Sequence, residues 1–350
     1  MNIVFSTTRQ WNPGDEFILM GCMNLLREHL GDFNPIIYNR NPQIRRARKF
    51  DIIKKIDNAF GKDFVEKFMD NSVKDRVPMD YADMVVFAGS PEWRGRRMVK
   101  LYDEIKAHNL PSVFLGLGTS GEFSFGDEHF TQVEQEVFKL AKLITTRDET
   151  AQRGLAPAGA IQLPCPALFS SKTESTVNSV KKIGLMYGTN SAVASNNVSD
   201  DTHQYMLDMY KKLIGDLGED YQFEFVAHYI DELSTFEKDF PGQTLRYSYD
   251  AKDYLDIYAS YDLVIGYRVH GIGISASMGI PGIMLAHDAR AATVEGFKAE
   301  QVTIGTDYST LREIILNSIN NISDKSQALQ SHKNATRKEY QELFQKHLPF

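Results

Sequence analysis

The feature that most constrains the fold is a regular alternation of short apolar runs with longer amphipathic stretches. Runs such as NIVFS (2–6), DMVVFAG (83–89) and PSVFLGLG (111–118) are each followed by residues with helical periodicity. Strands that are apolar on both faces are typical of a parallel sheet that helices cover on both sides. The alternation therefore predicts an α/β protein with a doubly wound parallel sheet.

The same alternation occurs twice, which predicts two domains. The polar stretch 170–182 (SSKTESTVNSVKK) interrupts it, and a second series begins with KIGLMYG at 182–188. We predict two Rossmann-like domains, residues 1–170 and 171–350, in agreement with a length of 350 residues. A ligand cleft is expected between them, because open α/β sheets bind ligands outside the carboxyl ends of their strands. The polar helical stretch 310–347 is expected on the outside, packed back against the first domain.

The charge of the chain argues against a nucleic-acid partner. The formal net charge is −7, whereas proteins that bind nucleic acids usually carry a basic domain or stripe. One basic cluster lies at 40–55 (RNPQIRRARKFDIIKK). Two interpretations of it stay open: a solvated helix face, or a surface that meets an anionic acceptor or a membrane.

Cysteine content and hydropathy indicate the compartment. Two cysteines, Cys22 and Cys165, are too few for the disulfide framework of a small secreted domain. The N-terminus MNIVFS has no secretory signal pattern, and the apolar stretch 17–26 is too short to span a bilayer. We expect a cytoplasmic protein without a transmembrane segment.

Polar residues follow several of the predicted strands, where the cleft is expected. In the loop 6–16, Asn12 fits a turn and Asp15 fits the cap of the next helix, and both are also candidates for the cleft, as is Arg9. Arg147 follows another strand, where a structural ion pair and a position at the sheet edge both fit it.

Further candidates come from a loop of the first domain and a strand end of the second. Trp93 lies in the predicted loop 88–97, where an aromatic ring can stack on a sugar, although core packing also explains it. His228 and Asp231 close the predicted strand 221–230.

The most specific stretch is GYRVHGIG at 266–273, directly after the apolar run YDLVI. If the strand persists, alternation places Arg268 and His270 on the same side. Arginine binds a carboxylate or phosphate in bidentate fashion, and histidine, with an unperturbed pKa of about 6.5, exchanges protons near neutral pH. The next strand ends in further polar residues at the same edge: His287, Asp288 and Arg290. The sequence therefore predicts an anion site that contains a proton donor.

Together these motifs resemble the polysaccharide pyruvyl transferase family over nearly the whole chain. The block from Gly266 to Pro281 is similar to the family's G-x-R-(L/V)-H-(G/A)…G-x-P pattern and is the most specific match. The other matches are the N-x-G-D opening at Asn12–Asp15, the D-x-(apolar)-G segment at Asp83–Gly89, the G-x-G turn at Gly116–Gly118, the R-D pair at Arg147–Asp148 and the D-x-R element at Asp288–Arg290.

The resemblance implies a GT-B-like arrangement of two Rossmann-like domains and a transferase activity. Members of the family transfer pyruvate from phosphoenolpyruvate to saccharide hydroxyls, usually as a cyclic ketal, in the biosynthesis of cell-surface or exopolysaccharides. The implied partners are phosphoenolpyruvate and a saccharide or lipid-linked saccharide acceptor, with no cofactor and no metal. Peripheral membrane contact, the acceptor sugar and the oligomeric state stay open.

By resemblance, Arg268 and His270 would be catalytic residues at the donor. Arg268 would bind the anion, and His270 would donate or relay the proton that C3 of phosphoenolpyruvate needs before a hydroxyl attacks C2. The other candidates for donor binding are Arg147, Gly271, His287 and Arg290. The candidates for the acceptor or the cleft are Arg9, Asn12, Asp15, Trp93, His228 and Asp231.

The chain departs from the family pattern at two places. Ala88-Gly89-Ser90 stands where the family often has a glycine-rich triplet, and Cys165-Pro166 stands where it often has Asp-Pro. Two alternative functions share the fold. One is a GT-B glycosyltransferase, which would bind a uridine or guanosine diphosphate, and the other is a non-catalytic saccharide-binding protein, which would bind glycans without releasing phosphate.

Overall fold

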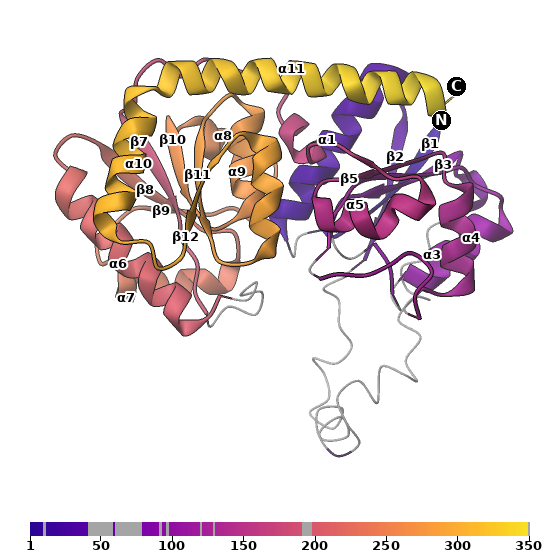
Figure 1. Ribbon diagram of the computed structural model, residues 1–350, viewed down its shortest axis with the longest axis horizontal. Coiled ribbons are helices and arrows are strands. Elements are labelled where there is room, and N and C mark those ends of the chain that lie inside the picture. Colours follow the sequence, from indigo (N-terminus) through magenta and orange to yellow (C-terminus); the bar gives the residue numbers. More distant parts are fainter. Residues whose placement is uncertain are drawn as a thin grey trace.

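The computed structural model describes residues 1–9, 12–40, 59, 79–90, 93–95, 98–119, 121–128, 130–190 and 198–348. The described residues form two parallel sheets of six strands each, with helices packed against them (Figure 1). The α/β, doubly wound class predicted from the sequence is confirmed. The basic cluster predicted at 40–55 lies outside the described residues, apart from Arg40.

The first sheet has the strand order β2-β1-β3-β4-β5-β6, and every neighbouring pair is parallel. Its strands are β1 (Asn2–Thr7), β2 (Asn34–Asn39), β3 (Met84–Ala88), β4 (Ser112–Leu117), β5 (Leu143–Thr146) and β6 (Ile161–Gln162). The helices described with it are α1 (Pro13–Leu30), η3 (Met79–Tyr81), α3 (Val99–Ala107), α4 (Gln132–Leu140), α5 (Glu149–Leu155), η5 (Ala156–Ala158) and η6 (Pro166–Phe169). Because β1 lies between β2 and β3, the strand order reverses there and opens a crevice at the carboxyl ends of the strands.

The second sheet has the strand order β12-β11-β10-β7-β8-β9, again with parallel neighbours. Its strands are β7 (Lys182–Met186), β8 (Gln222–Val226), β9 (Leu245–Arg246), β10 (Leu263–Gly266), β11 (Gly282–Ala286) and β12 (Glu300–Thr303). The helices are α6 (Asp200–Leu217), η7 (Ile230–Glu232), α7 (Leu233–Asp239), α8 (Asp253–Ala259), α9 (Val269–Ser277), η8 (Ala289–Phe297), α10 (Tyr308–Asn320) and α11 (Ile322–His347). Here the order reverses between β7 and β10.

Burial explains why the central strands read as continuous apolar runs. Every residue of β3, β4 and β10 is buried. Both faces of these strands therefore lie against other parts of the protein, as a doubly wound sheet requires. No alternation of apolar and polar residues is needed there.

The apolar run AIQLPCPALF at 160–169 forms a much shorter strand than its length and composition suggest. Only the two residues of β6 pair with β5. Pro164 and Pro166 have no N–H to donate to a ladder, so the extended run cannot continue as a strand. Pro166 instead begins η6.

The strand that leads into Arg268 and His270 also ends earlier than predicted. β10 stops at Gly266, and α9 begins at Val269. Arg268 is the extended residue that precedes the helix, and His270 lies in the first helical turn. The two side chains therefore do not alternate along a strand, and this part of the sequence prediction is wrong.

Helix α11, drawn in yellow in Figure 1, runs along both sheets. Lys333 is buried and its Nζ donates to the backbone oxygen of Ser277 at the end of α9 (2.5 Å). Further along, the Gln341 side chain donates to the backbone oxygen of Leu25 in α1 (3.1 Å). The C-terminal helix thus contacts elements of the first sheet, while the boundary at residues 170 and 171 stays a prediction.

We predict that Tyr340→Ala destabilises the protein. Tyr340 is fully buried in α11, its hydroxyl donates to the Pro164 backbone oxygen (2.9 Å), and its ring packs on Phe169. Loss of a buried aromatic ring of this size costs about 3–5 kcal/mol. Urea denaturation followed by tryptophan fluorescence measures the change.

The matched control is Glu342→Ala, on the exposed face of the same helix, which is expected to stay within about 0.5 kcal/mol of wild type. Equal unfolding midpoints for the two variants would show that this contact does not stabilise the fold.

Candidate active site

A cavity of about 370 Å³ lies between the two sheets, at the carboxyl ends of their strands. Its volume falls in the range of roughly 300 to 1,000 Å³ that is usual for small-molecule sites. From the first sheet, the lining residues are Asn12, Gly14, Asp15, Ser90 and Arg147. From the second, they are His228, Tyr229, Tyr267, Arg268, Val269, His270, His287, Asp288 and Arg290. The cleft expected between the two domains is therefore lined by both.

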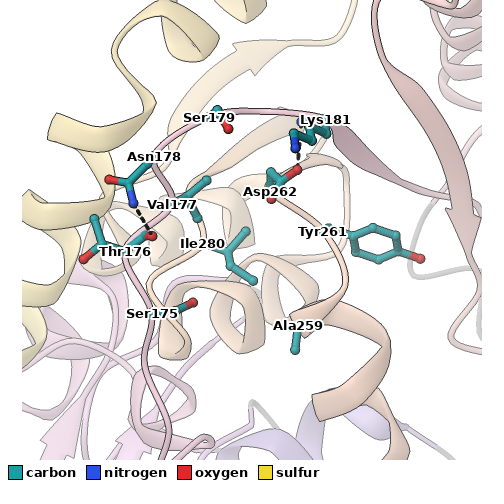
Figure 2. A pocket seen from close by; sticks show the side chains of 10 residues that line it. All are labelled: Ser175, Thr176, Val177, Asn178, Ser179, Lys181, Ala259, Tyr261, Asp262 and Ile280. Atoms are coloured by element: carbon teal, nitrogen blue, oxygen red, sulfur yellow. Dashed lines mark hydrogen bonds between the residues drawn. The ribbon is translucent and has the colours of Figure 1, made fainter.

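A second cavity of about 310 Å³ lies at the opposite, amino ends of β7 and β10 (Figure 2). It is lined by Ser175, Thr176, Val177, Asn178, Ser179, Lys181, Ala259, Tyr261, Asp262 and Ile280. The Asp262 carboxylate there accepts the backbone N–H groups of Lys181 (2.8 Å) and Lys182 (2.9 Å). This carboxylate fixes the start of β7, and none of the site residues predicted from the sequence lies in this cavity.

The first turn of α1 packs directly on His270. Asn12 caps the helix by accepting the Gly14 N–H on its side-chain oxygen (3.0 Å), and the Tyr229 hydroxyl donates to the same oxygen across the cavity (3.3 Å). A Cβ atom on Gly14 would lie 2.7 Å from Nδ1 of His270. Glycine is therefore needed at this position so that the ring from the second sheet can reach α1.

Arg268 is buried beside an equally buried carboxylate. It forms an ion pair with Glu232, which also accepts the backbone N–H groups of His228 (2.9 Å) and Tyr229 (3.1 Å). The guanidinium carbon lies 4.4 Å from the ring centre of Tyr229 and 4.5 Å from that of Tyr267, so two aromatic faces enclose it. Its Nε and Nη1 atoms are buried and have no hydrogen-bond partner within the described part of the chain.

Arg147 and His270 meet across the two sheets. Nη1 of Arg147 lies 2.9 Å from Nε2 of His270. Because a guanidinium is always protonated and can only donate, Nε2 accepts and the neutral ring carries its proton on Nδ1. Burial, together with the charges of Arg147 and Arg290, holds the pKa of His270 well below its usual value. In this arrangement His270 is neutral at neutral pH.

Two further groups complete the electrostatics of the cavity. The Asp288 carboxylate accepts hydrogen bonds from the backbone N–H (2.9 Å) and the Nε–H (2.8 Å) of Arg290. Burial tends to raise the pKa of Asp288, but these bonds and the Arg290 charge lower it overall. His228 lies 2.8 Å from the Tyr258 hydroxyl, and burial and the nearby Arg268 charge lower its pKa well below the usual value.

Both departures from the family pattern lie at or next to the cavity. Ser90 lines it and has a left-handed backbone with φ of 72°. Burial raises the pKa of the fully buried Cys165 thiol, although the nearby Arg147 charge acts to lower it, so the sulfur stays neutral. Arg147 therefore lies near two neutral groups, the thiol and the imidazole, and its buried Nε has no partner among the described residues.

Four of the residues predicted for the site do not line the cavity. Trp93 is only 1% exposed: its indole N–H donates to the Gly118 backbone oxygen (2.9 Å), and its ring packs among phenylalanines, so it cannot stack on a sugar. Arg9 pairs with Glu16 (2.6 Å). Asp231 is partly exposed on η7. Gly271 is buried, where a Cβ atom would meet the Tyr258 hydroxyl at 2.6 Å.

Three important residues were missed by the sequence analysis: Tyr229, Tyr267 and Glu232. Tyr229 follows His228 and Tyr267 precedes Arg268 in the sequence. Each tyrosine is therefore adjacent to a predicted site residue, and this adjacency is the signal that could have identified it. Glu232 gave no such signal, because its ion pair with Arg268 joins residues 36 positions apart.

Comparison with solved structures defines the class of fold. A putative UDP-N-acetylglucosamine 2-epimerase from Listeria monocytogenes has a TM-score of 0.55 at 13% identity, covering 94% of this chain and 90% of that one. The S. aureus MnaA–UDP structure gives 0.54 at 13%, covering 93% and 90%. The Neisseria meningitidis UDP-GlcNAc 2-epimerase bound to UDP-GlcNAc gives 0.54 at 9%, covering 99% and 100%. At these identities the likeness concerns the fold alone, and it confirms the GT-B-like arrangement.

Sequence comparison gives the family. The polysaccharide pyruvyl transferase family profile matches residues 12–289. The chain therefore belongs to the polysaccharide pyruvyl transferase family, as its motifs suggest. No curated protein sequence matches it.

Searches for metal-binding clusters and membrane spans covered the described residues. Within them, no group of three or more His, Cys, Asp or Glu side chains could hold a metal ion. Within the same residues, no helix is both long and apolar enough to cross a membrane.

We predict that Gly14→Ala destabilises the protein because the new methyl group would overlap the His270 ring. Overpacking of this kind costs about 1–3 kcal/mol. The matched control is Gly215→Ala in α6, where a Cβ atom meets nothing within 4 Å. This control should gain up to about 1 kcal/mol, because alanine is the better helix former. Urea denaturation of both variants measures the difference, and an unchanged Gly14→Ala protein would contradict the packing of His270 on α1.

Proposed function

We propose that the protein transfers pyruvate from phosphoenolpyruvate to hydroxyls of a saccharide acceptor and forms a pyruvate ketal. The observation that carries the proposal is the set of three arginines around one cavity: Arg147, Arg268 and Arg290. Phosphoenolpyruvate has a carboxylate and a phosphate, the two groups that guanidinium binds best. The three guanidinium groups therefore support a donor site between these side chains.

The energetics of Arg147 and Arg268 support an anionic ligand. Both side chains are at least nine-tenths buried, with guanidinium nitrogens that lack a hydrogen-bond partner among the described residues. A buried donor that is left unsatisfied costs free energy, more so when it is charged. A bound anion accepts these hydrogen bonds and offsets that cost.

The proposed chemistry places a proton and two hydroxyls around C2 and C3 of the donor. His270 supplies a proton to C3 while the first acceptor hydroxyl adds to C2, which leaves a tetrahedral carbon that still carries phosphate. The second hydroxyl then displaces phosphate from C2 and closes the ketal. Arg268 holds the donor and stabilises charge on the leaving phosphate. The scheme uses no metal and no cofactor.

The acceptor is proposed to enter from the side of the first sheet. Asn12, Asp15 and Ser90 line that wall. The Asp15 carboxylate, buried at the start of α1, is suited to take the proton from an attacking hydroxyl. The acceptor is a saccharide or a lipid-linked saccharide.

We predict that Arg268→Lys weakens phosphoenolpyruvate binding by about 10- to 100-fold. Lysine keeps a cation beside Glu232 but loses the planar fork that binds an anion through two parallel bonds. Hydrogen bonds to charged groups contribute about 1.5–3 kcal/mol, and 1.4 kcal/mol corresponds to a factor of ten. Isothermal titration calorimetry on folded protein measures the affinity.

The matched control is Arg246→Lys, another arginine in an ion pair, which joins Glu224 (3.2 Å) at the edge of the second sheet. Its affinity for phosphoenolpyruvate should equal that of wild type. Binding of uridine or guanosine diphosphate, without binding of phosphoenolpyruvate, would contradict the proposal and indicate a glycosyltransferase. Glycan binding without phosphate release from phosphoenolpyruvate would indicate a non-catalytic protein.

A further inference from the structure

The contact between Arg147 and His270 fixes where the imidazole proton lies. Arg147 follows β5 in the first sheet, and His270 lies in the first turn of α9 beside the second. The guanidinium donates to Nε2, at 2.9 Å. In the arrangement observed, His270 therefore has no proton on the nitrogen that faces Arg147 and cannot act as an acid there.

Titratable and charged groups from the elements around His270 line the same cavity. They are Asp15 on α1, Arg147 after β5, His228 after β8, Arg268 before α9, His287 and Asp288 after β11, and Arg290 on η8. Asp288 is bound to Arg290, yet the Arg290 charge still lowers the pKa of His270. Burial acts with Arg147, Arg290 and His228 to keep the ring neutral.

We propose that binding of an anion in the cavity loads His270 with the proton that the reaction consumes. The anion accepts the N–H groups of Arg147, which leaves Nε2 of His270 without a donor. Nε2 then takes one proton from solvent and donates it toward the bound anion. The inference rests on the anion site of the proposed function.

The physical reason lies in the charges around the ring. A bound anion compensates the positive charges of Arg147 and Arg290, the two arginines that lower the pKa of His270. The pKa of His270 is therefore higher in the complex than in the free protein. Between these two pKa values the free ring is neutral and the bound ring is charged, so binding takes up a proton and weakens as the pH rises. Arg147 is a positioning residue in this scheme, and His270 is the acid.

The consequence for catalysis is that the acid forms only when a donor anion is present. Protonation of C3 needs an imidazolium near the donor, and a permanently charged imidazolium would add to the repulsion among three arginines. Coupling the proton to the anion avoids that repulsion in the free protein. The coupling also delivers the proton to Nε2, the nitrogen that accepts a hydrogen bond from Arg147 in the free protein.

The test uses isothermal titration calorimetry with sulfate and with phosphoenolpyruvate near pH 7, in buffers of different ionisation enthalpy. Sulfate does not itself titrate near neutral pH, so any proton taken up with it belongs to the protein. We expect an uptake of about half to one proton per sulfate, and an affinity that falls by up to about tenfold per pH unit.

The decisive variant is His270→Gln, whose side-chain oxygen can still accept from Arg147. It should bind sulfate without proton uptake. The matched control, His332→Gln, changes an imidazole in α11 that lies outside the cavity, 3.0 Å from the Gly296 backbone oxygen, and it should keep the uptake. Far-ultraviolet circular dichroism and melting temperature confirm that each variant is folded.

The outcomes separate this inference from the proposed function. Sulfate binding to wild type without proton uptake, or uptake that persists in His270→Gln, overturns the inference. Sulfate binding with the expected uptake, but no binding of phosphoenolpyruvate, supports the inference and rejects the proposed donor. Failure of both anions to bind rejects the anion site and with it both proposals.

Discussion

The site depends on the contact that His270 makes with both Gly14 and Arg147. The ring from the second sheet lies against the backbone of α1 and within 2.9 Å of a guanidinium that follows β5. Three strand ends from two sheets meet there, so the cavity exists only when the two halves are packed as observed. Because Gly14 has no side chain, the His270 ring from the second sheet can lie this close to α1.

The charge of the cavity contrasts with that of the whole chain. The protein carries a formal net charge of −7, yet three arginines line one cavity. Glu232 pairs with one of them from within the protein, and Asp288 pairs with another. Arg147 is the third, and walls of low dielectric strengthen its field in the cavity although the protein as a whole is acidic.

Ser90 and Cys165, which depart from the family pattern, lie on the cavity wall and near Arg147, respectively. A neutral thiol beside Arg147 leaves the guanidinium charge uncompensated on that side. Ser90 keeps a side chain in a backbone conformation that favours glycine, and it does so on the cavity wall. Ser90 on the cavity wall and Cys165 near Arg147 both lie outside the strands of the two sheets.

The sequence alone determined the α/β class, the two sheets and most of the strand ends that carry polar residues. Local periodicity and burial on both faces decide these features, and both can be read along the chain. The tertiary structure decided which side chains meet: it joined Arg147 to His270, residues 123 positions apart, paired Arg268 with Glu232, and placed Trp93 in an aromatic core rather than in the cavity. It also began α9 at Val269, so Arg268 and His270 point to different partners. Such pairings arise from the packing of distant segments, and no local pattern records them.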